Sequence, residues 1–343
     1  MAEKRPRILF VINDLKTGGA ENQTLLQISG LIKIGYKVML VTLWDRGEMR
    51  TSLHRKCGYC SLEMDKKNPA GAFLRLRAIY REFRPDIVVS RLYYAGIITK
   101  LSLFTEKKII YIVIQGSRDA WRNAVSDIPD IFLNLSVDGF VANSLSSAHL
   151  LRRLGVEKKK IHMIGNGFDE NVLKYKKRER FNLIGFVGRY SHAKGLDRFI
   201  DYISTYGEKE YKIYLAGRPE AIDYTQSEKV CWNLTDRERI FEDIDILIIS
   251  SRWEGFPNVA AEAILCGCVV VACSSLSLEH IFGEHIYYYS SLSGLHSIIE
   301  KIRNTPHTQR KRSIEARRFL VRNYRIGKIV SEYDRFYKMM LEK

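Results

Sequence analysis

The chain has 343 residues, of which 46% are hydrophobic and 27% charged, a globular composition that excludes a disordered or fibrous protein. Its length exceeds what one compact core usually holds, so we expect about two domains. The formal net charge is +16, no apolar run approaches the roughly 18 residues of a membrane-spanning helix, and the apolar stretch after the basic residues 4–7 is too short for an export signal.

Short runs rich in Ile and Val alternate with longer amphipathic stretches, which predicts βαβ units and parallel sheets. In the first half the predicted strands are 7–12, 37–43, 87–90, 109–114, 139–142 and 161–164. In the second half they are 182–187, 212–216, 246–250, 269–273 and 287–289. The charge run 174–180 lies between the two series and predicts a solvated connector. Ligands of such sheets bind beyond the carboxyl ends of the strands, so the chemistry should lie in the strand-to-helix loops.

The first such loop, residues 14–21, follows the opening strand and carries Gly18 and Gly19. Paired glycines let backbone N–H groups approach an anion at a helix N-terminus. The spacing matches neither GxGxxG nor a Walker-type phosphate loop, so a tight turn without a ligand is the alternative.

The second loop, residues 187–195, follows the first strand of the second half. Its Arg189 and Lys194 place a guanidinium and an ammonium group where they suit a diphosphate. A solvated pair of cations is the alternative.

The third loop leads from a buried strand into a helix and reads SSRWEGFPNVAAEA over residues 250–263. We expect the helix to begin near Asn258, so that Glu254 precedes it and Glu262 lies about one turn inside it. Carboxylates accept hydrogen bonds from vicinal hydroxyls, so each glutamate could hold a sugar ring, while the first amides of the helix would face phosphates. The alternative is one surface glutamate and one capping glutamate.

These motifs resemble those of the retaining glycosyltransferases of family 4, also called glycosyl transferases group 1. The shared features are GGAE at 18–21, VANS at 141–144, GNG at 165–167, GRxxxxKG at 188–195, and two glutamates eight positions apart at 254 and 262. The resemblance covers essentially the whole chain and implies an α/β protein with the GT-B fold, in which two Rossmann-like domains with parallel sheets face each other across a cleft. It implies an acceptor-side domain at 1–170, a nucleotide-sugar donor domain at 181–325, and a C-terminal helix at 326–343 that crosses back to the first domain.

The resemblance also implies roles for individual residues. Arg189 and Lys194 would bind the donor diphosphate, and together with Glu254 they would act in catalysis. Glu254 would take the hydroxyls of the transferred sugar and Glu262 those of the ribose. The remaining donor-site residues would be Gly188, Gly255, Phe256, Pro257, Asn258 and Val259, with Gly18 and Gly19 closing over the phosphates from the first domain. No cofactor and no metal are expected.

Two stretches depart from the family's pattern. Many members have a histidine near the end of the fourth strand of the first domain, where this chain offers only Gln115, Ser117 and Arg118 as acceptor-side candidates. The segment 217–230 is short for one that leads to the base-binding loop, so the nucleobase contacts around 231–234 stay open.

Two other patterns suggest metal sites but lack the right setting. Asp243 and Asp245 form a DxD pair, yet they directly precede a predicted strand, which is the wrong end of it for the cleft. The six cysteines include no second CxxC and no nearby histidine pair, so we expect reduced, structural thiols.

The positive charge is unevenly placed. Residues 1–180 carry 32 basic and 18 acidic side chains, a net charge of +14, which points to a polyanionic partner. The segment 71–84 has an apolar face bordered by arginines, which indicates either a membrane-surface helix or a helix packed on its own sheet. Because acceptors in the resembled family are often lipid-linked sugars, we expect a cytoplasmic protein attached peripherally to an anionic membrane face, with no nucleic-acid partner.

The function favoured by these patterns is transfer of a sugar from a nucleotide-sugar, UDP-linked rather than GDP-linked, to a hydroxyl of a lipid-linked or cell-surface glycan. Such a step belongs to polysaccharide biosynthesis, as in O-antigen, other lipopolysaccharide or capsule. Two alternatives stay open: a basic nucleic-acid-binding protein, and a nucleotide-sugar epimerase on the same fold.

Overall fold

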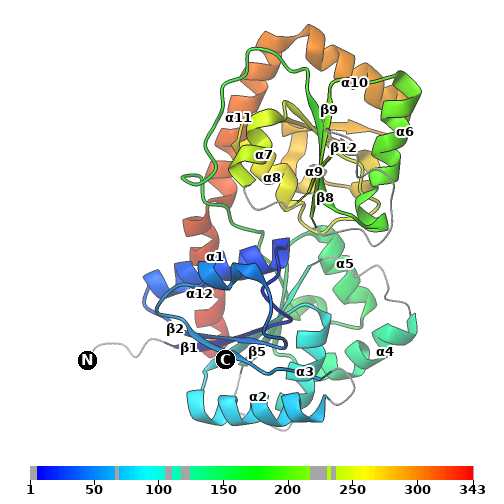
Figure 1. The fold of residues 1–343 in the computed structure, drawn as a ribbon. Helices are drawn as coiled ribbons and strands as arrows, with labels where there is room; N and C mark the ends of the chain where they lie inside the picture. The colour runs from blue at the N-terminus through cyan, green and yellow to red at the C-terminus, as the bar shows by residue number, and fades with distance from the viewer. Residues whose placement is uncertain are drawn as a thin grey trace. The chain divides into compact units, whose positions relative to one another are not determined.

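The computed structural model describes residues 6–65, 69–104, 110–116, 124–216, 230–232 and 237–342. The chain divides into two compact units (Figure 1). Unit 1 comprises Met1–Gly167 and Ile326–Lys343, and unit 2 comprises Phe168–Arg325. The last stretch of the sequence thus belongs to the same unit as the first.

The described part of unit 1 is built on a parallel seven-stranded sheet in the order β3-β2-β1-β4-β5-β6-β7. The strands are β1 (Arg7–Ile12), β2 (Lys37–Thr42), β3 (Gly58–Ser61), β4 (Ile87–Arg91), β5 (Ile110–Gln115), β6 (Gly139–Ala142) and β7 (Ile161–Met163). The helices are α1 (Gly19–Lys33), α2 (Ala70–Phe83), α3 (Tyr93–Leu103), α4 (Ala124–Leu133), α5 (Leu145–Arg153) and α12 (Ile326–Leu341). The central strands are continuously apolar because helices cover both faces of a parallel sheet.

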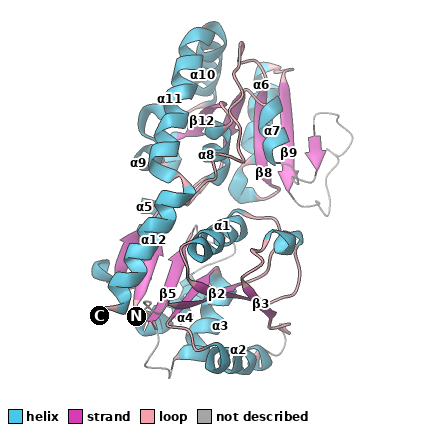
Figure 2. Cartoon of the chain, turned by 90° about the vertical axis from the view of Figure 1, so that its left-hand side faces the viewer, coloured by secondary structure: helices cyan, strands magenta, loops and turns pink. Residues whose placement is uncertain are grey.

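Helix α12 lies beside α1, although some 300 residues separate them in sequence (Figures 1 and 2). Gly30 permits this approach, because a Cβ atom there would lie 2.3 Å from Cγ2 of Val330. Gln27 Nε2 donates to the hydroxyl oxygen of Tyr337 at 2.8 Å, and that tyrosine is fully buried. The C-terminal helix is therefore an integral part of unit 1.

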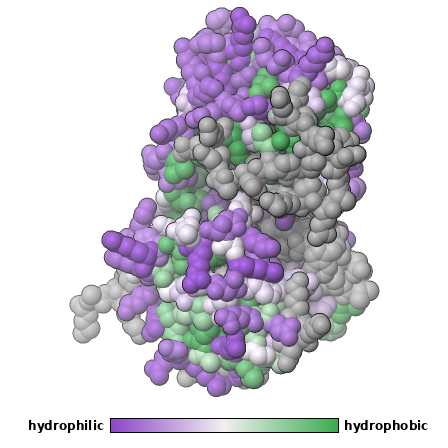
Figure 3. Space-filling model, in the orientation of Figure 1, coloured by the Kyte–Doolittle hydropathy of each residue, from purple (hydrophilic) through white to green (hydrophobic). Residues whose placement is uncertain are grey.

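The described part of unit 2 contains a parallel six-stranded sheet in the order β10-β9-β8-β11-β12-β13. The strands are β8 (Ile184–Arg189), β9 (Tyr211–Ala216), β10 (Val230–Trp232), β11 (Ile246–Ile249), β12 (Val269–Cys273) and β13 (Tyr287–Tyr289). The helices are α6 (Leu196–Tyr206), α7 (Arg237–Asp243), α8 (Asn258–Leu265), α9 (Glu279–Phe282), α10 (Leu292–Asn304) and α11 (Pro306–Tyr324). Two apolar clusters of buried side chains form its core, and one of them includes most of α8. Hydrophilic residues cover the surface around α10 and the start of α11 (Figure 3).

The predicted α/β class is confirmed, since both units are built on parallel sheets. Strands β1, β6, β12 and β13 have the predicted bounds. Strands β3 and β10, which lie at sheet edges, were not predicted.

Helix α2 packs on its own sheet, which decides between the two interpretations of residues 71–84. Leu76 is buried, and Ile79, Tyr80 and Phe83 pack against the core of unit 1. The apolar face of α2 is therefore packed against the core of unit 1, and the side that meets solvent carries Arg75, Arg81 and Glu82 together with Leu74, which is 65% exposed.

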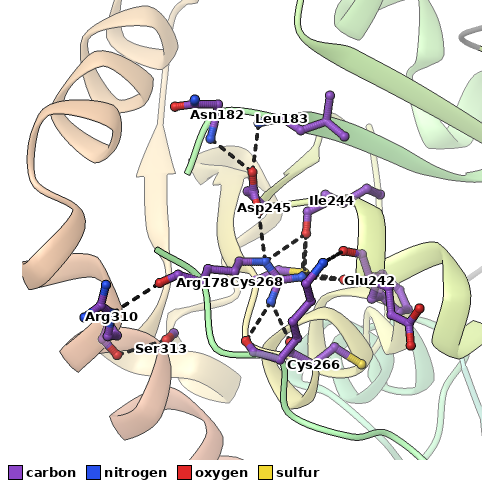
Figure 4. A network of polar contacts seen from close by, with 12 residues as sticks. Arg178, Asn182, Leu183, Glu242, Ile244, Asp245, Cys266, Cys268, Arg310 and Ser313 are labelled. Atoms are coloured by element: carbon purple, nitrogen blue, oxygen red, sulfur yellow. Dashed lines mark hydrogen bonds and ion pairs between the residues drawn. The ribbon is translucent and has the colours of Figure 1, made fainter. Parts of the chain in front are cut away.

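The expectation of a solvated connector at 174–180 is wrong at Arg178. Its side chain is only 2% exposed and lies among backbone carbonyls of unit 2 (Figure 4). Nε donates to Asp245 Oδ1 at 3.1 Å, and the Nη atoms donate to the carbonyl oxygens of Cys266 and Ile244, each at 2.7 Å. A guanidinium has five N–H donors, and its burial is tolerated where these donors find acceptors.

Candidate active site

Two loops of unit 2 meet at the carboxyl edge of its sheet. The β8 loop (residues 190–195) follows β8, and the β11 loop (residues 250–257) follows β11. Because β8 and β11 are neighbouring parallel strands, their carboxyl ends lie on the same edge. The topology therefore brings together two predicted loops that are about 60 positions apart.

The side chains of Lys194 and Glu254 form an ion pair between these loops. Lys194 Nζ lies 2.6 Å from Glu254 Oε1, and the Ser251 hydroxyl donates to the same carboxylate oxygen at 2.7 Å. The side chains of Lys194 and Glu254 are 23% and 9% exposed, so the pair is largely shielded from water. Charge-assisted hydrogen bonds in such a setting are strong and fix the carboxylate in place.

A cavity of about 20 Å³ adjoins this pair, which is room for about one water molecule. Its polar wall carries Lys194, Ser251 and Glu254, and its remaining lining residues are Phe186, Val187, Ile248, Ile249, Ser250, Pro257 and Val259. Charged groups thus stand over an apolar base, where electrostatic interactions are less screened than in bulk water.

Arg252 clamps the two loops together, a role that the sequence did not indicate. Its guanidinium forms a two-pronged ion pair with Asp197 at the start of α6, with an Nη1–Oδ1 distance of 2.8 Å, and donates to the carbonyl oxygen of His192 at 2.9 Å. Hydrogen bonds from Arg252 lower the pKa of Asp197 to about 2. The signal in the sequence was an arginine inside the SRWEGFP stretch, but its partner lies 55 positions away.

Gly195 is required where the β8 loop enters α6. Its φ is +66°, and a Cβ atom there would lie 2.2 Å from the carbonyl oxygen of Ser250. The Ser250 hydroxyl donates to the Gly195 carbonyl at 2.7 Å, so the two loop backbones touch at this point. Gly188 lies under the aliphatic stem of Lys194, because a Cβ atom there would lie 3.5 Å from Lys194 Cγ.

Arg189 is exposed at the end of β8, and its guanidinium makes no hydrogen bond or ion pair with any residue that the structure describes. A guanidinium at this edge of the sheet can bind an anion, because its five N–H donors suit the oxygens of a phosphate or carboxylate. Arg189 therefore stands beside the same two loops but is not part of the ion-paired cluster.

Helix α8 begins at Asn258, as predicted, with Pro257 at its N-cap position. Proline has no side-chain acceptor to offer the first amides of the helix, and these amides form the positive end of its dipole. Glu262 lies inside the helix and is 5% exposed. Gly255 is also buried, and the Phe256 ring packs against Phe168, Phe282 and Tyr324, so only the backbone of Phe256 could face a ligand.

In unit 1, the predicted glycine loop joins β1 to α1. Gly18 is the N-cap residue of α1, Gly19 is its first residue, and a Cβ atom at Gly18 would lie 2.1 Å from a carboxylate oxygen of Glu21. The amide of Thr17 donates to Glu48 Oε1 at 2.9 Å, and the Thr17 hydroxyl lowers the pKa of Glu48. Glu48 thus fixes the loop at Thr17. The missing side chain of Gly18 leaves room for the Glu21 carboxylate over the first turn of α1.

The acceptor-side candidates fall mostly outside the described residues. Gln115 ends β5, where its backbone pairs with Ala142, while Ser117 and Arg118 lie outside the described part of the chain. Of the region expected to hold the nucleobase, only residues 230–232 are described.

The DxD pair lies at the amino end of β11 and is engaged in the structure. Asp243 Oδ2 accepts hydrogen bonds from Lys212 Nζ at 2.7 Å and from the Tyr214 hydroxyl at 2.8 Å, and Asp245 binds Arg178. Within the described ranges, no group of three or more His, Cys, Asp or Glu side chains is placed to hold a metal ion. The helices that the structure describes include none with the length and apolar character to cross a membrane.

Comparison with known proteins identifies both units. Residues 17–172 match the family model described as Glycosyltransferase Family 4, and residues 181–302 match the model described as Glycosyl transferases group 1. Among curated proteins, an "Uncharacterized 41.2 kDa protein in cps region" of Klebsiella pneumoniae is 25% identical over 237 residues, covering 64% of this chain and 66% of that protein. A mannosylfructose-phosphate synthase of Agrobacterium fabrum is 28% identical over 174 residues, covering 40% of this chain and 38% of that protein. The chain thus spans about two thirds of the first relative and about two fifths of the second.

Solved structures resemble the chain over nearly its whole length. HepE from Anabaena, in complex with UDP and glucose, matches with a TM-score of 0.82 at 17% identity, covering 98% of this chain and all of that one. Sucrose-phosphate synthase from Thermosynechococcus elongatus matches with a TM-score of 0.81 at 14% identity, with the same coverage. At these identities the likeness establishes the fold alone, which is the GT-B fold expected from the sequence.

Proposed function

Because the chain is a glycosyltransferase that carries both domains of the GT-B fold, we propose that it transfers a sugar from a UDP-sugar to a hydroxyl of a lipid-linked or cell-surface glycan, with retention at the anomeric carbon. The observation that carries the proposal is the cluster at the carboxyl edge of the unit 2 sheet, where Lys194, Glu254 and the first turn of α8 lie around one cavity.

A uridine nucleotide is favoured by the structural neighbours. HepE from Anabaena has been solved with UDP, with UDP-glucose, and with UDP and glucose. The relative from the cps region of Klebsiella pneumoniae supports a place in polysaccharide biosynthesis, such as capsule, O-antigen or lipopolysaccharide. The transfer assay described below would identify the sugar.

The donor would lie across the two loops of unit 2. In this proposal Arg189, Lys194 and the amides of Asn258 and Val259 bind the diphosphate, because cations and helix N-termini neutralise phosphate charge. Glu254 accepts hydrogen bonds from the transferred sugar. Lys194 has three N–H donors, so it can bind a phosphate oxygen while keeping its contact with Glu254.

The other predicted roles complete this arrangement. Glu262 binds the ribose hydroxyls, and Gly188, Gly255 and the backbone of Phe256 allow the donor to approach closely. Gly18 and Gly19 close over the phosphates from the first domain, and the role of the family's acceptor-side histidine is vacant or passes to Gln115, Ser117 or Arg118. These assignments rest on the family resemblance and on the positions of the residues in their loops.

For the chemical step, we propose substitution on the front face of the donor. The acceptor oxygen forms its bond to the anomeric carbon on the side from which the diphosphate departs, and the acceptor proton passes to a phosphate oxygen of the leaving group. Arg189, Lys194 and the α8 terminus stabilise the negative charge that develops on that group, without a metal ion.

Because the proposed acceptor is linked to a lipid, we also propose that the protein works at a membrane surface. The net charge of +14 over residues 1–180 would attract an anionic leaflet, at about 1 kcal/mol per basic residue near the surface. Since the apolar face of α2 is packed against the core, the attraction would be electrostatic and would not depend on that helix inserting.

The test is a transfer assay with labelled nucleotide-sugars. The protein is incubated with UDP- and GDP-linked sugars and a lipid-linked glycan fraction, with a hexose phosphate as a second acceptor because one relative is a mannosylfructose-phosphate synthase. We expect label to enter the lipid-linked fraction from a UDP-sugar, with the anomeric configuration of the donor kept in the product. Conversion of the donor without any acceptor would indicate an epimerase and would contradict transfer, as would calorimetry without binding of UDP or GDP.

A further inference from the structure

Helix α8 connects the candidate donor site to the opposite side of unit 2. At one end Val259 lines the cavity that holds Lys194 and Glu254. The helix has eight residues, so its other end lies about 12 Å away. Two turns of helix have little stability of their own, so the position of α8 depends on what holds it.

Two arginines hold the C-terminal end of α8. The last carbonyls of a helix lack partners within the helix. Here Arg317 Nη1 donates to the carbonyl of Leu265, and Arg178 Nη1 donates to that of Cys266 at 2.7 Å. The amide of Lys176 donates to the Cys266 carbonyl as well, at 3.1 Å. Two guanidinium groups thus stand at the negative end of the helix dipole, where positive charge is favourable.

Arg178 also ties α8 to the strands that carry the two loops (Figure 4). Its Nε donates to Asp245 at 3.1 Å, immediately before β11. The other carboxylate oxygen of Asp245 accepts the amides of Asn182 and Leu183, each at 3.1 Å, immediately before β8. One guanidinium therefore joins the end of α8 to the amino ends of the two strands whose carboxyl ends carry the β8 and β11 loops.

Arg317 anchors the same end of α8 from another direction. It lies on α11, and its Nη1 also donates to the carbonyl of Leu173 at 3.0 Å, in the segment that enters unit 2. Helix α8 is thus fixed along its axis by side chains from the entering segment and from α11. None of these contacts involves a residue of the predicted donor-binding motifs.

We propose that Arg178 and Arg317 are positioning residues for donor binding: by fixing the C-terminal end of α8, they set the position of its first amides against Lys194 and Glu254. The proposal rests on the donor site proposed above. It predicts that weakening either arginine lowers the affinity for UDP while the protein remains folded.

The experiment compares three variants of the full chain. Arg178→Lys keeps the charge but loses most of the guanidinium's hydrogen bonds, and Arg317→Met removes the second contact from a side chain that is only half-buried. Arg312→Met is the matched control, because Arg312 is also a half-buried arginine on α11 but donates to the carbonyl of Ile286, away from α8. Circular dichroism fixes a temperature at which every variant is folded, and calorimetry then gives the dissociation constant for UDP.

We expect Arg178→Lys and Arg317→Met to weaken UDP binding about fivefold or more, the scale of coupling between two linked sites. Arg312→Met should lower the melting temperature but leave UDP affinity within about twofold, because distant sites act independently. Wild-type UDP affinity in both Arg178→Lys and Arg317→Met, each measured while folded, would overturn the proposal. Weakening of UDP binding by the same factor in the Arg312→Met control would overturn it as well. If Arg178→Lys does not fold, Arg317→Met decides alone.

Hydrogen exchange separates this proposal from the donor assignment. Exchange at the amides of α8 should be faster in Arg178→Lys and Arg317→Met than in the wild type and in Arg312→Met, and unchanged exchange would overturn the positioning role. Absence of UDP binding in the wild type would count against the proposed function instead, and the exchange result would still decide whether the two arginines fix the helix.

Discussion

At the scale of single residues, the ion pair between Lys194 and Glu254 is the feature whose loss we expect to affect transfer most. Lys194→Met replaces the ammonium group with an apolar side chain of similar length. We expect kcat/KM for transfer to fall about 100-fold or more, because removing one group that stabilises a developing charge has an effect of this size. The melting temperature should fall as well, because Glu254 loses its cationic partner in a setting largely shielded from water, so the kinetics are measured at a temperature where the variant is folded.

Lys209→Met is the control for this substitution, since Lys209 is an exposed lysine of the same unit outside both loops. Steady-state kinetics with the UDP-sugar found in the transfer assay would measure both variants. A Lys194 variant with wild-type kcat/KM would contradict the role given to this residue.

The pair between Arg252 and Asp197 gives a prediction for pH. The pKa of Asp197 is lowered to about 2 from an ordinary value near 3.8, so its contribution to stability is present above pH 4 and is lost as the pH falls toward 2. Because the Asp197 side chain is 56% exposed, the contribution should be only about 0.5 kcal/mol.

Thermal unfolding of the wild type and of Asp197→Asn measures this contribution. Asp197→Asn should melt at a lower temperature at pH 6, and the two curves should converge toward pH 2. A constant difference across this range would mean that the carboxylate's charge plays no part in the pair.

Single residues could be placed at the site from the sequence where they belong to a recognisable motif. They could not be placed where their position depends on a contact with a residue far away in the sequence. Lys194 and Glu254 were predicted at the candidate site and lie together in the structure, although their roles there stay predictions. Arg252 was missed because Asp197 reaches it only through the fold. Arg178 was expected to be solvated, since a charged run gives no sign that carbonyls from two other segments of the chain will surround one of its members.

At the scale of elements, the turn from the β8 loop into α6 depends on a glycine. Gly195→Ala puts a Cβ atom within 2.2 Å of the Ser250 carbonyl at a φ of +66°. We expect a loss of about 2 kcal/mol in the free energy of unfolding, because strain of this kind costs 1–3 kcal/mol. Denaturant unfolding measures it.

Gly207→Ala is the control for that substitution. Gly207 also has a positive φ, +61°, but a Cβ atom there would meet nothing within 4 Å. Gly207→Ala should be destabilised by backbone strain alone, so its loss in the free energy of unfolding should be smaller than that of Gly195→Ala. An equal loss in both variants would show that contact with Ser250 does not matter.

The turn between α8 and β12 gives a chemical prediction. Burial raises the pKa of Cys266 and Cys268 to about 12, so their thiols stay protonated at neutral pH. A thiolate is the reactive form, and both thiols should resist a disulfide reagent in the folded protein at pH 8 and react after unfolding. Fast labelling of either in the native state, read by mass spectrometry, would contradict their burial.

Strands could be predicted from the sequence where their burial requires a run of apolar residues. Strands β1, β6 and β12 are largely buried apolar runs, and their bounds were predicted to the residue. Strands β3 and β10 lie at the edges of their sheets, where one side has no neighbouring strand, and no residue of β3 is buried. An edge strand therefore needs no buried apolar run, which makes it harder to predict, although the edge strands β7 and β13 were both predicted.

At the scale of the whole molecule, the charge predicts how the protein meets a membrane. We expect it to bind vesicles that contain anionic lipid and to be released as salt rises, because a Debye length of about 8 Å at physiological ionic strength screens exposed charges. Co-sedimentation at several salt concentrations measures the binding, with neutral vesicles as the control. Binding to neutral vesicles, or binding that salt does not weaken, would contradict an electrostatic attachment.

The place of α12 in unit 1 has a consequence for synthesis on the ribosome. Unit 2 is one continuous stretch and can acquire its complete set of contacts as soon as residue 325 has left the exit tunnel. Unit 1 begins first but cannot be completed before residues 326–341, since the side of α1 that carries Gln27 and Gly30 packs against α12. The unit translated first is therefore completed last, and until then a nascent chain leaves the side of α1 that later contacts α12 exposed to solvent.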